Sequence, residues 1–354
     1  MAAQIPQEVI EKIKQVSPGT KLRKALDQVI EAQLGALIVF INEDEMKAYP
    51  QVFQAGFKID APFSPERLYE LSKMDGAIVV DEHVSRILAA NVHLVPDPSI
   101  PTSETGTRHR TAERIAKQLK KMVIAISKRR NVVTLYYKEY KHVFEDMKFV
   151  LTKVSQTLNT LERFREIFDR DLELLNYKEI EGNVTLDFIC GLLLRSAEIH
   201  NITSEIQLQI IELGIEGRLA SLRLREVLRD LDELTLLLIM DYHKKDVTEE
   251  DARKLMEEMW GLEYKHLTFA KFLGYDVSST HKASETFVVP RGYRLLRTAI
   301  HIPMNVSQKV IDSYRNLGNL IKTDVNHLQE IDGIGKKRAR AILKTIKSIK
   351  KRRG

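Results

Sequence analysis

The first part of the chain combines two hydrophobic patterns, one typical of helices and one typical of buried strands. Apolar residues recur at helical spacing over 6–16 and 20–33, and residues 35–41 then form a continuous apolar run of strand length. The same criteria predict further strands at 77–81, 87–95, 122–127 and 132–137, and helices at 64–74 and 108–121. This alternation indicates an α/β domain with a mixed central sheet flanked by helices, which we place at residues 1–140.

From residue 143 onward the hydrophobic pattern is helical. Apolar residues from Met147 to Leu175 keep a three-and-four spacing without Gly or Pro, which predicts one long helix over 143–177. Further helices are predicted at 184–200, 203–213, 216–243 and 248–260, the last beginning with a capping box at Thr248 and Asp251. We therefore expect an all-α spacer or oligomerisation domain at 141–289, which ends in a linker over 262–290.

Residues 290–354 predict a third, all-α domain. A helix at 291–301 is stopped by Pro303, and a second helix covers about 306–316. A turn at 331–335, Ile-Asp-Gly-Ile-Gly, then leads into a helix that begins near residue 336. The spacing fits a helix-hairpin-helix motif, in which glycines let the backbone approach a phosphate and the second helix points its N-terminus at it. The positions that fit are Leu328, Ile331, Gly333, Gly335 and Ala339.

The net charge of +6 is concentrated at this C-terminal end. Residues 336–353 hold ten Lys and Arg and no acid, so the rest of the chain carries a net charge of about −4. Such a cluster repels itself unless a polyanion neutralises it, which favours nucleic acid over the alternative of a solvated helix face. A P-loop is excluded because Glu330 and Lys337 replace the required Gly and Ser or Thr. We predict sequence-independent binding of DNA phosphates by Gly333, Gly335, Lys336, Lys337, Arg338 and Arg340.

The composition, with 44% apolar and 29% charged residues, is that of a folded protein. No stretch approaches the roughly 18 apolar residues of a membrane helix and the N-terminus has no signal-peptide pattern, so we expect a cytoplasmic protein without membrane contact. Cys190, the only cysteine, lies among apolar residues and indicates a buried thiol without disulfide chemistry. The ten histidines lack the spacing of a dedicated zinc site.

The most informative stretch for chemistry is the start of the predicted helix at 108–121. Residues 107–111, Thr-Arg-His-Arg-Thr, place two arginines, a histidine and two hydroxyls at a helix N-terminus. Free backbone N–H groups and the helix dipole favour an anion there, and these side chains add charge-assisted donors. The alternative, a merely solvated basic surface, would work against the dipole. We therefore predict a cradle for a polyphosphate.

A second candidate lies where the helix at 64–74 ends. Ser64 and Pro65 have the form of an N-cap and first helical residue, and the chain turns at Asp75 and Gly76 before a short buried strand. Asp75 is thus a carboxylate at the mouth of a sheet, beside a glycine that lets a ligand approach the backbone. An Asp before a Gly is also a common turn former, so this stretch alone leaves both interpretations open.

Together, Asp75-Gly76-Ala77 and Gly-Thr-Arg-His-Arg-Thr at 106–111 resemble the two signature motifs of the diadenylate cyclase domain. The intervening segment at 91–98, Asn-Val-His-Leu-Val-Pro-Asp-Pro, is similar to that family as well. With the helical spacer and the helix-hairpin-helix, the chain resembles the DNA-integrity scanning diadenylate cyclases from about residue 8 to its end.

The resemblance implies condensation of two ATP molecules into cyclic di-adenosine monophosphate (c-di-AMP) with release of two pyrophosphates. Arg108, His109 and Arg110 would hold the triphosphate with the hydroxyls of Thr107 and Thr111. Asp75 would bind magnesium or manganese and help to activate the attacking 3′-hydroxyl. The family pattern also places Gly76, Ala77 and Leu94 in the nucleotide site, with the adenine near Leu94.

The expected partners are ATP, DNA and other copies of the chain. Since each site would hold one ATP, two sites must face each other, which predicts an oligomer with a head-to-head catalytic pair. The resemblance implies an octamer, a preference for branched DNA such as Holliday junctions, and a cyclase that is down-regulated by such DNA.

Two other functions compete with this interpretation. The first is a DNA-binding or repair scaffold without nucleotide chemistry, which would yield no dinucleotide from ATP and a metal ion. The second is a histidine phosphatase, suggested by Arg108 and His109. That family needs Arg-His-Gly just after its first strand, whereas here Arg110 follows and the pair opens a helix well into the domain.

Overall fold

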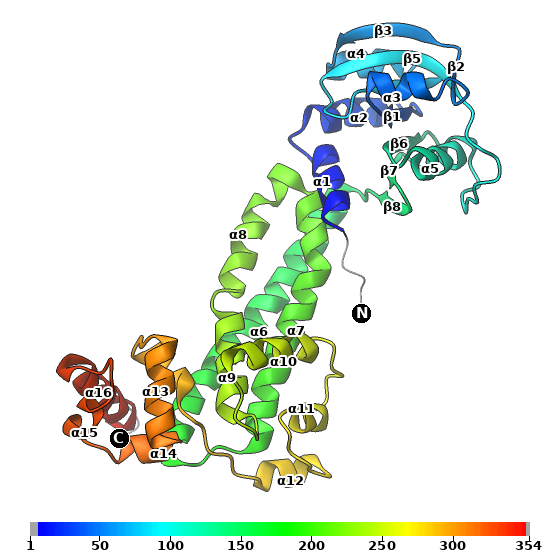
Figure 1. Cartoon of the computed structure of the whole chain (residues 1–354). Coiled ribbons are helices and arrows are strands. Elements are labelled where there is room, and N and C mark those ends of the chain that lie inside the picture. Colours follow the sequence, from blue (N-terminus) through cyan, green and yellow to red (C-terminus); the bar gives the residue numbers. More distant parts are fainter. Residues whose placement is uncertain (1–5, 352–354) are drawn as a thin grey trace. The chain divides into compact units, whose positions relative to one another are not determined.

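The computed structural model describes residues 6–351 and divides into two compact units (Figure 1). The N-terminal unit contains the described residues up to Gln156 together with Ile206–Ser221. The C-terminal unit contains Thr157–Glu205 and the described residues from Leu222 onward. Each unit is described by itself below.

The N-terminal unit is built on an eight-stranded sheet with the order β2-β5-β4-β1-β6-β7-β8, and β3 lies beside β5. β1 and β4 are parallel and the other pairs are antiparallel, so the sheet is mixed. The strands are β1 (Leu37–Phe40), β2 (Phe53–Gln54), β3 (Phe57–Pro62), β4 (Ala77–Val80), β5 (Arg86–Leu94), β6 (Met122–Ser127), β7 (Val132–Tyr137) and β8 (Tyr140–Val143).

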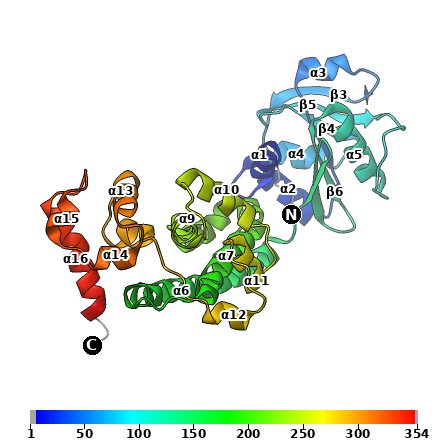
Figure 2. The same ribbon diagram turned by 60° about the horizontal axis from the view of Figure 1, so that its bottom comes forward.

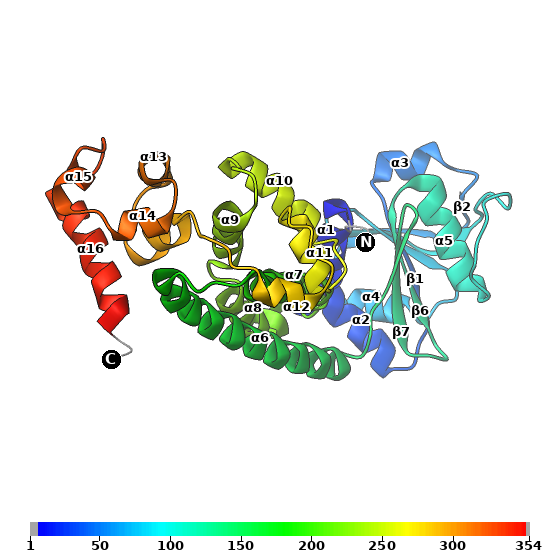
Figure 3. The same ribbon diagram turned by 90° about the horizontal axis from the view of Figure 1, so that it is seen from below.

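Helices cover both faces of this sheet, which Figure 3 shows nearly edge-on. Apolar residues of α1 (Gln7–Val16), α2 (Lys21–Glu31) and α4 (Pro65–Leu71) form a core with one face. α5 (Thr107–Leu119) packs on the opposite face, where α3 (Glu43–Ala48) contributes Met46. β1, β4 and β6 lie between these helices and are buried on both faces, as their continuous apolar runs predict.

The sequence correctly predicted the α/β class, the mixed sheet and five of its strands, at positions close to β1, β4, β5, β6 and β7. It missed α3, β2, β3 and β8. These elements are short or largely exposed, so their residues carry no continuous apolar run. β3 is also interrupted by a register shift after Lys58, near Asp60 with a φ of 47°, which breaks the alternation that a strand normally shows.

The rest of the chain is helical, as predicted. α6 (Met147–Glu181) and α7 (Leu186–Glu212) contribute residues to both units. They are followed by η1 (Gly214–Gly217), α8 (Arg218–Val227), α9 (Leu231–Tyr242), α10 (Glu249–Met259), α11 (His266–Phe272) and α12 (Thr280–Glu285). The last elements are η2 (Leu295–Ala299, a π-helix), α13 (Met304–Tyr314), α14 (Leu317–Ile321), α15 (Val325–Gln329) and α16 (Lys336–Lys351). α15 and α16 lie side by side (Figure 2).

Two predicted helix assignments in this region were wrong. The helices expected at 184–200 and 203–213 are one helix, α7, because the Ser204 hydroxyl bonds the His200 carbonyl and the helix continues through this polar stretch. The helix expected at 216–243 is broken between α8 and α9, where Asp230 has a left-handed φ of 55°.

The expected linker at 262–290 contains α11 and α12, which are anchored by buried residues such as Phe269 and Ala283. The helix expected at 291–301 is correct only in part, since its regular portion is the short π-helix η2.

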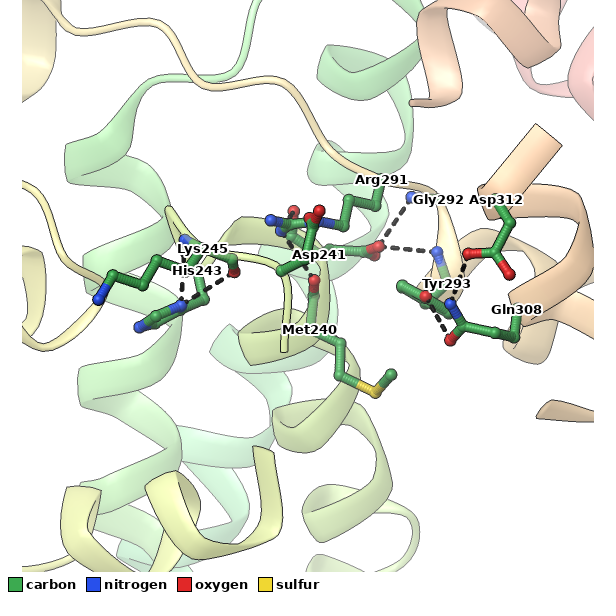
Figure 4. Close-up of polar contacts among 10 residues, drawn as sticks. Met240, Asp241, His243, Lys245, Arg291, Gly292, Tyr293, Gln308 and Asp312 are labelled. Carbon is green, nitrogen blue, oxygen red and sulfur yellow. Dashed lines mark hydrogen bonds and ion pairs between the residues drawn. The ribbon is translucent and has the colours of Figure 1, made fainter. Parts of the chain in front are cut away.

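A buried acid fixes the start of this last segment in the C-terminal unit (Figure 4). The Asp241 carboxylate at the end of α9 accepts the backbone N–H groups of Gly292, Tyr293 and Arg294, at 2.7, 2.7 and 3.0 Å. In the opposite direction, the Arg291 guanidinium donates to the Met240 carbonyl of α9 at 3.0 Å. These bonds satisfy backbone donors before η2 and a carbonyl in the last turn of α9 that would otherwise be left without partners.

An ion pair lies directly beside this carboxylate. Arg294 Nη2 is 2.6 Å from Glu179 Oε2 on α6, and the two side chains are 3% and 1% exposed. The Tyr242 hydroxyl donates to the other oxygen of Glu179 at 2.6 Å. Burial and the neighbouring charge of Glu179 raise the pKa of Asp241 to about 7.

Candidate functional site

α5 begins at Thr107, one residue before the start predicted from the sequence, and it follows the loop at 95–106. Residues of α5 hold this loop by hydrogen bonds. Glu113 accepts from the Thr102 hydroxyl at 2.5 Å, and Arg114 Nε donates to the Ile100 carbonyl at 2.9 Å. Lys117 Nζ donates to the Pro101 carbonyl at 3.1 Å. The loop therefore delivers Gly106, the N-cap, to a fixed position, with the first free N–H groups of the helix beyond it.

The structure brings the two predicted motifs together. Arg108 Nη2 on α5 lies 3.7 Å from Asp75 Oδ1, at the turn before β4. Asp75 is fully exposed, so its carboxylate is accessible to a ligand. Gly35 makes room for Arg108, because a Cβ at that position would lie 2.5 Å from the guanidinium. The pair thus places a cation and a carboxylate at one edge of the sheet.

A bulge in β5 holds the Asp75–Gly76 turn. Asn91 has a left-handed φ of 52°, and its side-chain oxygen accepts the Gly76 N–H at 3.1 Å. A Cβ at Gly76 would come within 2.4 Å of the Asn91 carbonyl carbon, so only glycine fits there. Gly76 was expected to let a ligand approach the backbone. In the structure it is the backbone of β5, at Asn91, that approaches Gly76 closely.

His109 is the last member of a series of polar side chains that contact one another. Its Nδ1 lies 2.9 Å from the Tyr136 hydroxyl on β7, and that hydroxyl donates to Glu104 Oε1 at 2.9 Å. Lys141 on β8 pairs with the same Glu104 oxygen at 2.5 Å. Burial lowers the pKa of His109, and the charges of Lys141 and Arg130 lower it further against the opposing charge of Glu104.

The remaining residues that were predicted to bind the nucleotide fall into two groups. Thr107 and Arg110 are exposed and Thr111 is half-buried, so all three lie at the accessible start of α5. Ala77 and Leu94 are buried in the core between the sheet and α5. Leu94 pairs with Phe53 of β2 at the end of β5. A ligand would meet Leu94 only at the small exposed part of its side chain.

No role in this site was predicted for Gly35, Asn91, Glu104 and Tyr136, or for the basic β6–β7 turn at 128–130, although Asn91 lies in the segment at 91–98 that is similar to the family. An Asn within a predicted strand is a weak signal for a left-handed bulge, and three consecutive cations in a turn could have been noticed beside a polyphosphate cradle. The other contacts join residues that are distant in sequence, so no local pattern reveals them.

The arrangement fits a hard divalent cation, which proteins often bind through one carboxylate with substrate phosphates and water completing the shell. The exposed Asp75 supplies such a carboxylate. Within residues 6–351, no three His, Cys, Asp or Glu side chains gather into a cluster able to hold a metal by themselves. A metal at this site would therefore depend on the nucleotide for part of its coordination.

The predicted DNA-binding residues surround the turn between α15 and α16. Gly333 has a φ of 91° and lies against Val306, whereas Gly335 borders open space. Arg338 donates to the Gly333 carbonyl at 2.7 Å and braces the turn. One face of α16 buries Ala339, Ile342 and Ile346, which leaves its cations on the exposed face. These include Lys336, Lys337, Arg338 and Arg340, while Arg352 and Arg353 lie outside the described residues.

Comparison with known proteins assigns the chain to a family. Residues 23–140 match the family described as DisA bacterial checkpoint controller nucleotide-binding, and residues 144–282 match the DisA bacterial checkpoint controller linker region. The DNA integrity scanning protein DisA of Thermotoga neapolitana is 49% identical over 350 residues, which cover 99% of each chain. The chain belongs to the DisA family of DNA integrity scanning proteins.

Other members of the DisA family support this assignment. DisA of Thermotoga maritima is 48% identical over 99% of this chain and 98% of its own, and DisA of Bacillus subtilis is 40% identical over 95% and 92%. A crystal structure of DacA from Staphylococcus aureus covers 40% of this chain and 91% of its own at 24% identity, but its TM-score of 0.30 is too low to establish a common fold.

Family membership makes this chain a diadenylate cyclase, an enzyme class that requires a divalent metal ion. The recognition of the two motifs in the sequence is thereby confirmed at the level of the family. In the part of the chain that the structure describes, no helix is long and apolar enough to cross a membrane.

Proposed function

We propose that the edge of the sheet formed by the Asp75 turn and the start of α5 is the cyclase site, where ATP is converted to c-di-AMP. The observation that carries this assignment is the approach of Arg108 to Asp75, at 3.7 Å, from motifs about thirty residues apart. A carboxylate for a metal and a positively polarised site for phosphates, here a helix N-terminus, are two elements that metal-assisted nucleotidyl transfer can use at one place.

The reaction consists of two equivalent transfers. In each, the 3′-hydroxyl oxygen of one ATP forms a bond to the α-phosphorus of the other, the bond to the β-phosphate oxygen breaks, pyrophosphate leaves, and the hydroxyl proton passes to a base or to water. Catalysis by the protein consists of positioning the two nucleotides and neutralising the charge that develops on the phosphate.

The residues act in distinct roles. Arg108, His109 and Arg110 hold the triphosphate with the hydroxyls of Thr107 and Thr111, and the first N–H groups of α5 add to the positive potential. The cations of the β6–β7 turn lie close enough for the charge of Arg130 to act on His109, which supports a role for this turn in neutralising phosphate. Gly76, Ala77 and Leu94 border the nucleoside.

Asp75 holds magnesium or manganese together with the nucleotide phosphates. When bound, the metal ion lowers the pKa of the attacking hydroxyl and offsets phosphate charge. Because one site holds one ATP, the active form is a head-to-head pair of these domains, within an octamer. We place the cyclase domain at 1–140, the spacer at 141–289 and the DNA-binding domain at 290–354, in a cytoplasmic protein.

The C-terminal domain binds DNA through a helix-hairpin-helix at α15 and α16. Support comes from the exposed backbone at Gly335, the left-handed Gly333 and the cations that follow. Contacts of this kind reach phosphates and not base edges, so binding is independent of sequence and depends strongly on salt. Branched DNA, such as a Holliday junction, is the expected ligand, and its binding lowers cyclase turnover.

One experiment tests both activities. Purified protein is incubated with ATP and magnesium or manganese, with and without a four-way DNA junction, and the nucleotides are separated by chromatography. We expect c-di-AMP and pyrophosphate, with a lower yield when the junction is present; linear duplex of equal length serves as the control. The absence of dinucleotide with either metal would contradict the cyclase site and favour a DNA-binding scaffold.

A further inference from the structure

A chain of four polar side chains ends at His109 in the N-terminal unit. It runs from Lys141 to Glu104, from Glu104 to the Tyr136 hydroxyl, and from there to His109 Nδ1. The separations are 2.5, 2.9 and 2.9 Å. Three of these residues lie outside both sequence motifs, so their arrangement arises only from the fold.

Each hydrogen bond in this series of side chains has a defined donor and acceptor. Burial raises the pKa of Glu104, but hydrogen bonds from Lys141 and Tyr136 outweigh it and hold the pKa below its usual range. Glu104 is therefore ionised at neutral pH and can only accept. Burial and the charge of Glu104 raise the pKa of Tyr136, so its hydroxyl keeps its proton and donates a hydrogen bond to Glu104.

The direction of that bond determines the tautomer of His109. Since the Tyr136 hydroxyl donates to Glu104, only its lone pairs face the imidazole, and His109 Nδ1 must carry a proton to bond with it. In the neutral ring Nε2 is then unprotonated. It is also the one ring nitrogen that this chain of contacts leaves available to a ligand.

We propose that Glu104 and Tyr136 are positioning residues, which hold His109 in its Nδ1-protonated form and fix Nε2 as the nitrogen that meets the triphosphate. The inference rests on the proposed function of His109 in phosphate binding. A hydrogen bond from Nε2 to a phosphate oxygen requires a second proton, so His109 takes one up when the nucleotide binds. Glu104, through Tyr136, stabilises the imidazolium that results.

The sheet and α5 fix the positions of these four side chains. Tyr136 is buried in the core shared by the sheet and α5, and the strand register places Lys141 of β8 directly opposite it. The Glu104 side chain is only 16% exposed. The charges that face His109 are Glu104, Lys141 and Arg130, from the loop before α5, from β8 and from the β6–β7 turn. Each of these elements is fixed by the sheet or by α5.

The test uses a matched pair of variants in the full-length chain. Tyr136→Phe keeps the buried ring and removes the hydroxyl between Glu104 and His109. Tyr137→Phe is the control, because the neighbouring hydroxyl bonds Glu8 at 3.1 Å on the other face of the sheet. The measured quantities are kcat and KM for ATP, and the equilibrium affinity for ATP, between pH 5 and 9.

We expect Tyr136→Phe to lower kcat/KM about tenfold, the scale of one buried hydrogen bond, and Tyr137→Phe to change it less than about twofold. We also expect the inflection in the pH profile of Tyr136→Phe to move to lower pH, because the imidazolium has lost its link to Glu104. A merely structural role would reduce activity equally at every pH and leave the inflection in place.

Glu104→Gln provides a second variant should the core substitution impair folding. Its amide can donate to the Tyr136 hydroxyl and let that hydroxyl turn toward His109, so the same pH shift is expected. If both variants keep the wild-type inflection and affinity for ATP, the positioning role is overturned. If the wild type binds ATP but forms no c-di-AMP, the cyclase assignment fails, while the affinities of the variants still decide the role of Glu104 and Tyr136.

Discussion

The Asp75 side chain is fully exposed, with one ion-pair contact of 3.7 Å to Arg108. A residue placed in this way contributes little to folding, since exposed ion pairs are worth less than about 1 kcal/mol. Replacing it should therefore separate catalysis from stability. This makes Asp75 the residue at which the site assignment can be tested with the fewest side effects.

We expect Asp75→Asn to reduce c-di-AMP formation by at least about 100-fold, because a neutral amide is a poor ligand for a hard divalent cation. DNA binding, oligomer size and thermal stability should stay at wild-type values. Asp44→Asn, at another exposed acid of the same unit, is the control and should keep full turnover. Near-full activity of Asp75→Asn would remove this residue from the mechanism.

The Glu179–Arg294 pair in the C-terminal unit is the opposite case, because both side chains are almost completely buried. Glu179→Gln would remove the charge that pairs directly with the buried guanidinium and leave only the nearby Asp241 to compensate it; breaking a buried pair typically costs about 3–5 kcal/mol. We expect a corresponding loss of stability in urea unfolding followed by helical circular dichroism. Glu173→Gln, at an exposed position of the same helix, should be neutral within about 0.5 kcal/mol.

At this scale the sequence revealed residues with chemically distinctive side chains in a local pattern. Asp75 was found from the turn before a short apolar strand, and Arg108 and His109 from the charges at a helix start, each a pattern of a few consecutive residues. Gly35 and Asn91 were not, because their importance comes from contacts with Arg108 and Gly76 that the sheet creates. Whether the predicted residues bind nucleotide stays a prediction.

Among the elements, α16 carries the clearest division of faces. Its buried stripe of Ala339, Ile342 and Ile346 fixes the helix and turns its cations outward. Two groups of cations on this helix can be compared, because they lie at different distances from the Gly333 turn and only the nearer group includes Arg338, which bonds the Gly333 carbonyl.

We expect the triple change of Lys336, Lys337 and Arg338 to Ala to weaken binding to a four-way junction. The dependence of log Kd on log salt should become shallower by up to about 0.9 for each lost phosphate contact. The matched control changes Lys344, Lys347 and Lys350, farther along the same helix, and should alter the slope less. Equal effects of the two triples would mean that the hairpin has no special role in DNA binding.

Long elements with strong periodicity were predictable, whereas short or irregular ones were not. The 35 residues of α6 and the apolar runs of β1 and β6 leave little ambiguity. The break at Asp230 was missed because the apolar spacing continues across it, although the backbone there is left-handed. α11 and α12 were missed because each has only six or seven residues and contributes few buried positions.

For the molecule as a whole, the uneven distribution of charge was evident from the sequence, but the buried charges of the C-terminal unit were not. Asp241, Glu179 and Arg294 come from segments far apart in the chain and meet only after folding. Their burial makes the stability of the C-terminal unit depend on pH.

The pKa of Asp241 is raised from an ordinary value of 3.8 to about 7 on folding. The folded state therefore holds this proton more tightly, and the stabilisation is complete below about pH 4 and is lost as pH rises toward 7. We expect the Tm of the C-terminal unit, measured in the full chain, to fall between pH 5 and pH 8. In Asp241→Asn the fall should be smaller, and an unchanged pH dependence in that variant would exclude Asp241 as its source.

The buried Cys190 has a practical consequence for studying the motions of this protein. It is the only cysteine of the chain, it is fully buried, and its surroundings raise the pKa of the thiol to about 12, so maleimide reagents should leave it untouched. A thiol introduced at an exposed position, such as Ser348→Cys, would then be the one reactive handle. A fluorophore or spin label at that position could thus report changes around α16 as DNA is added, on the natural sequence background.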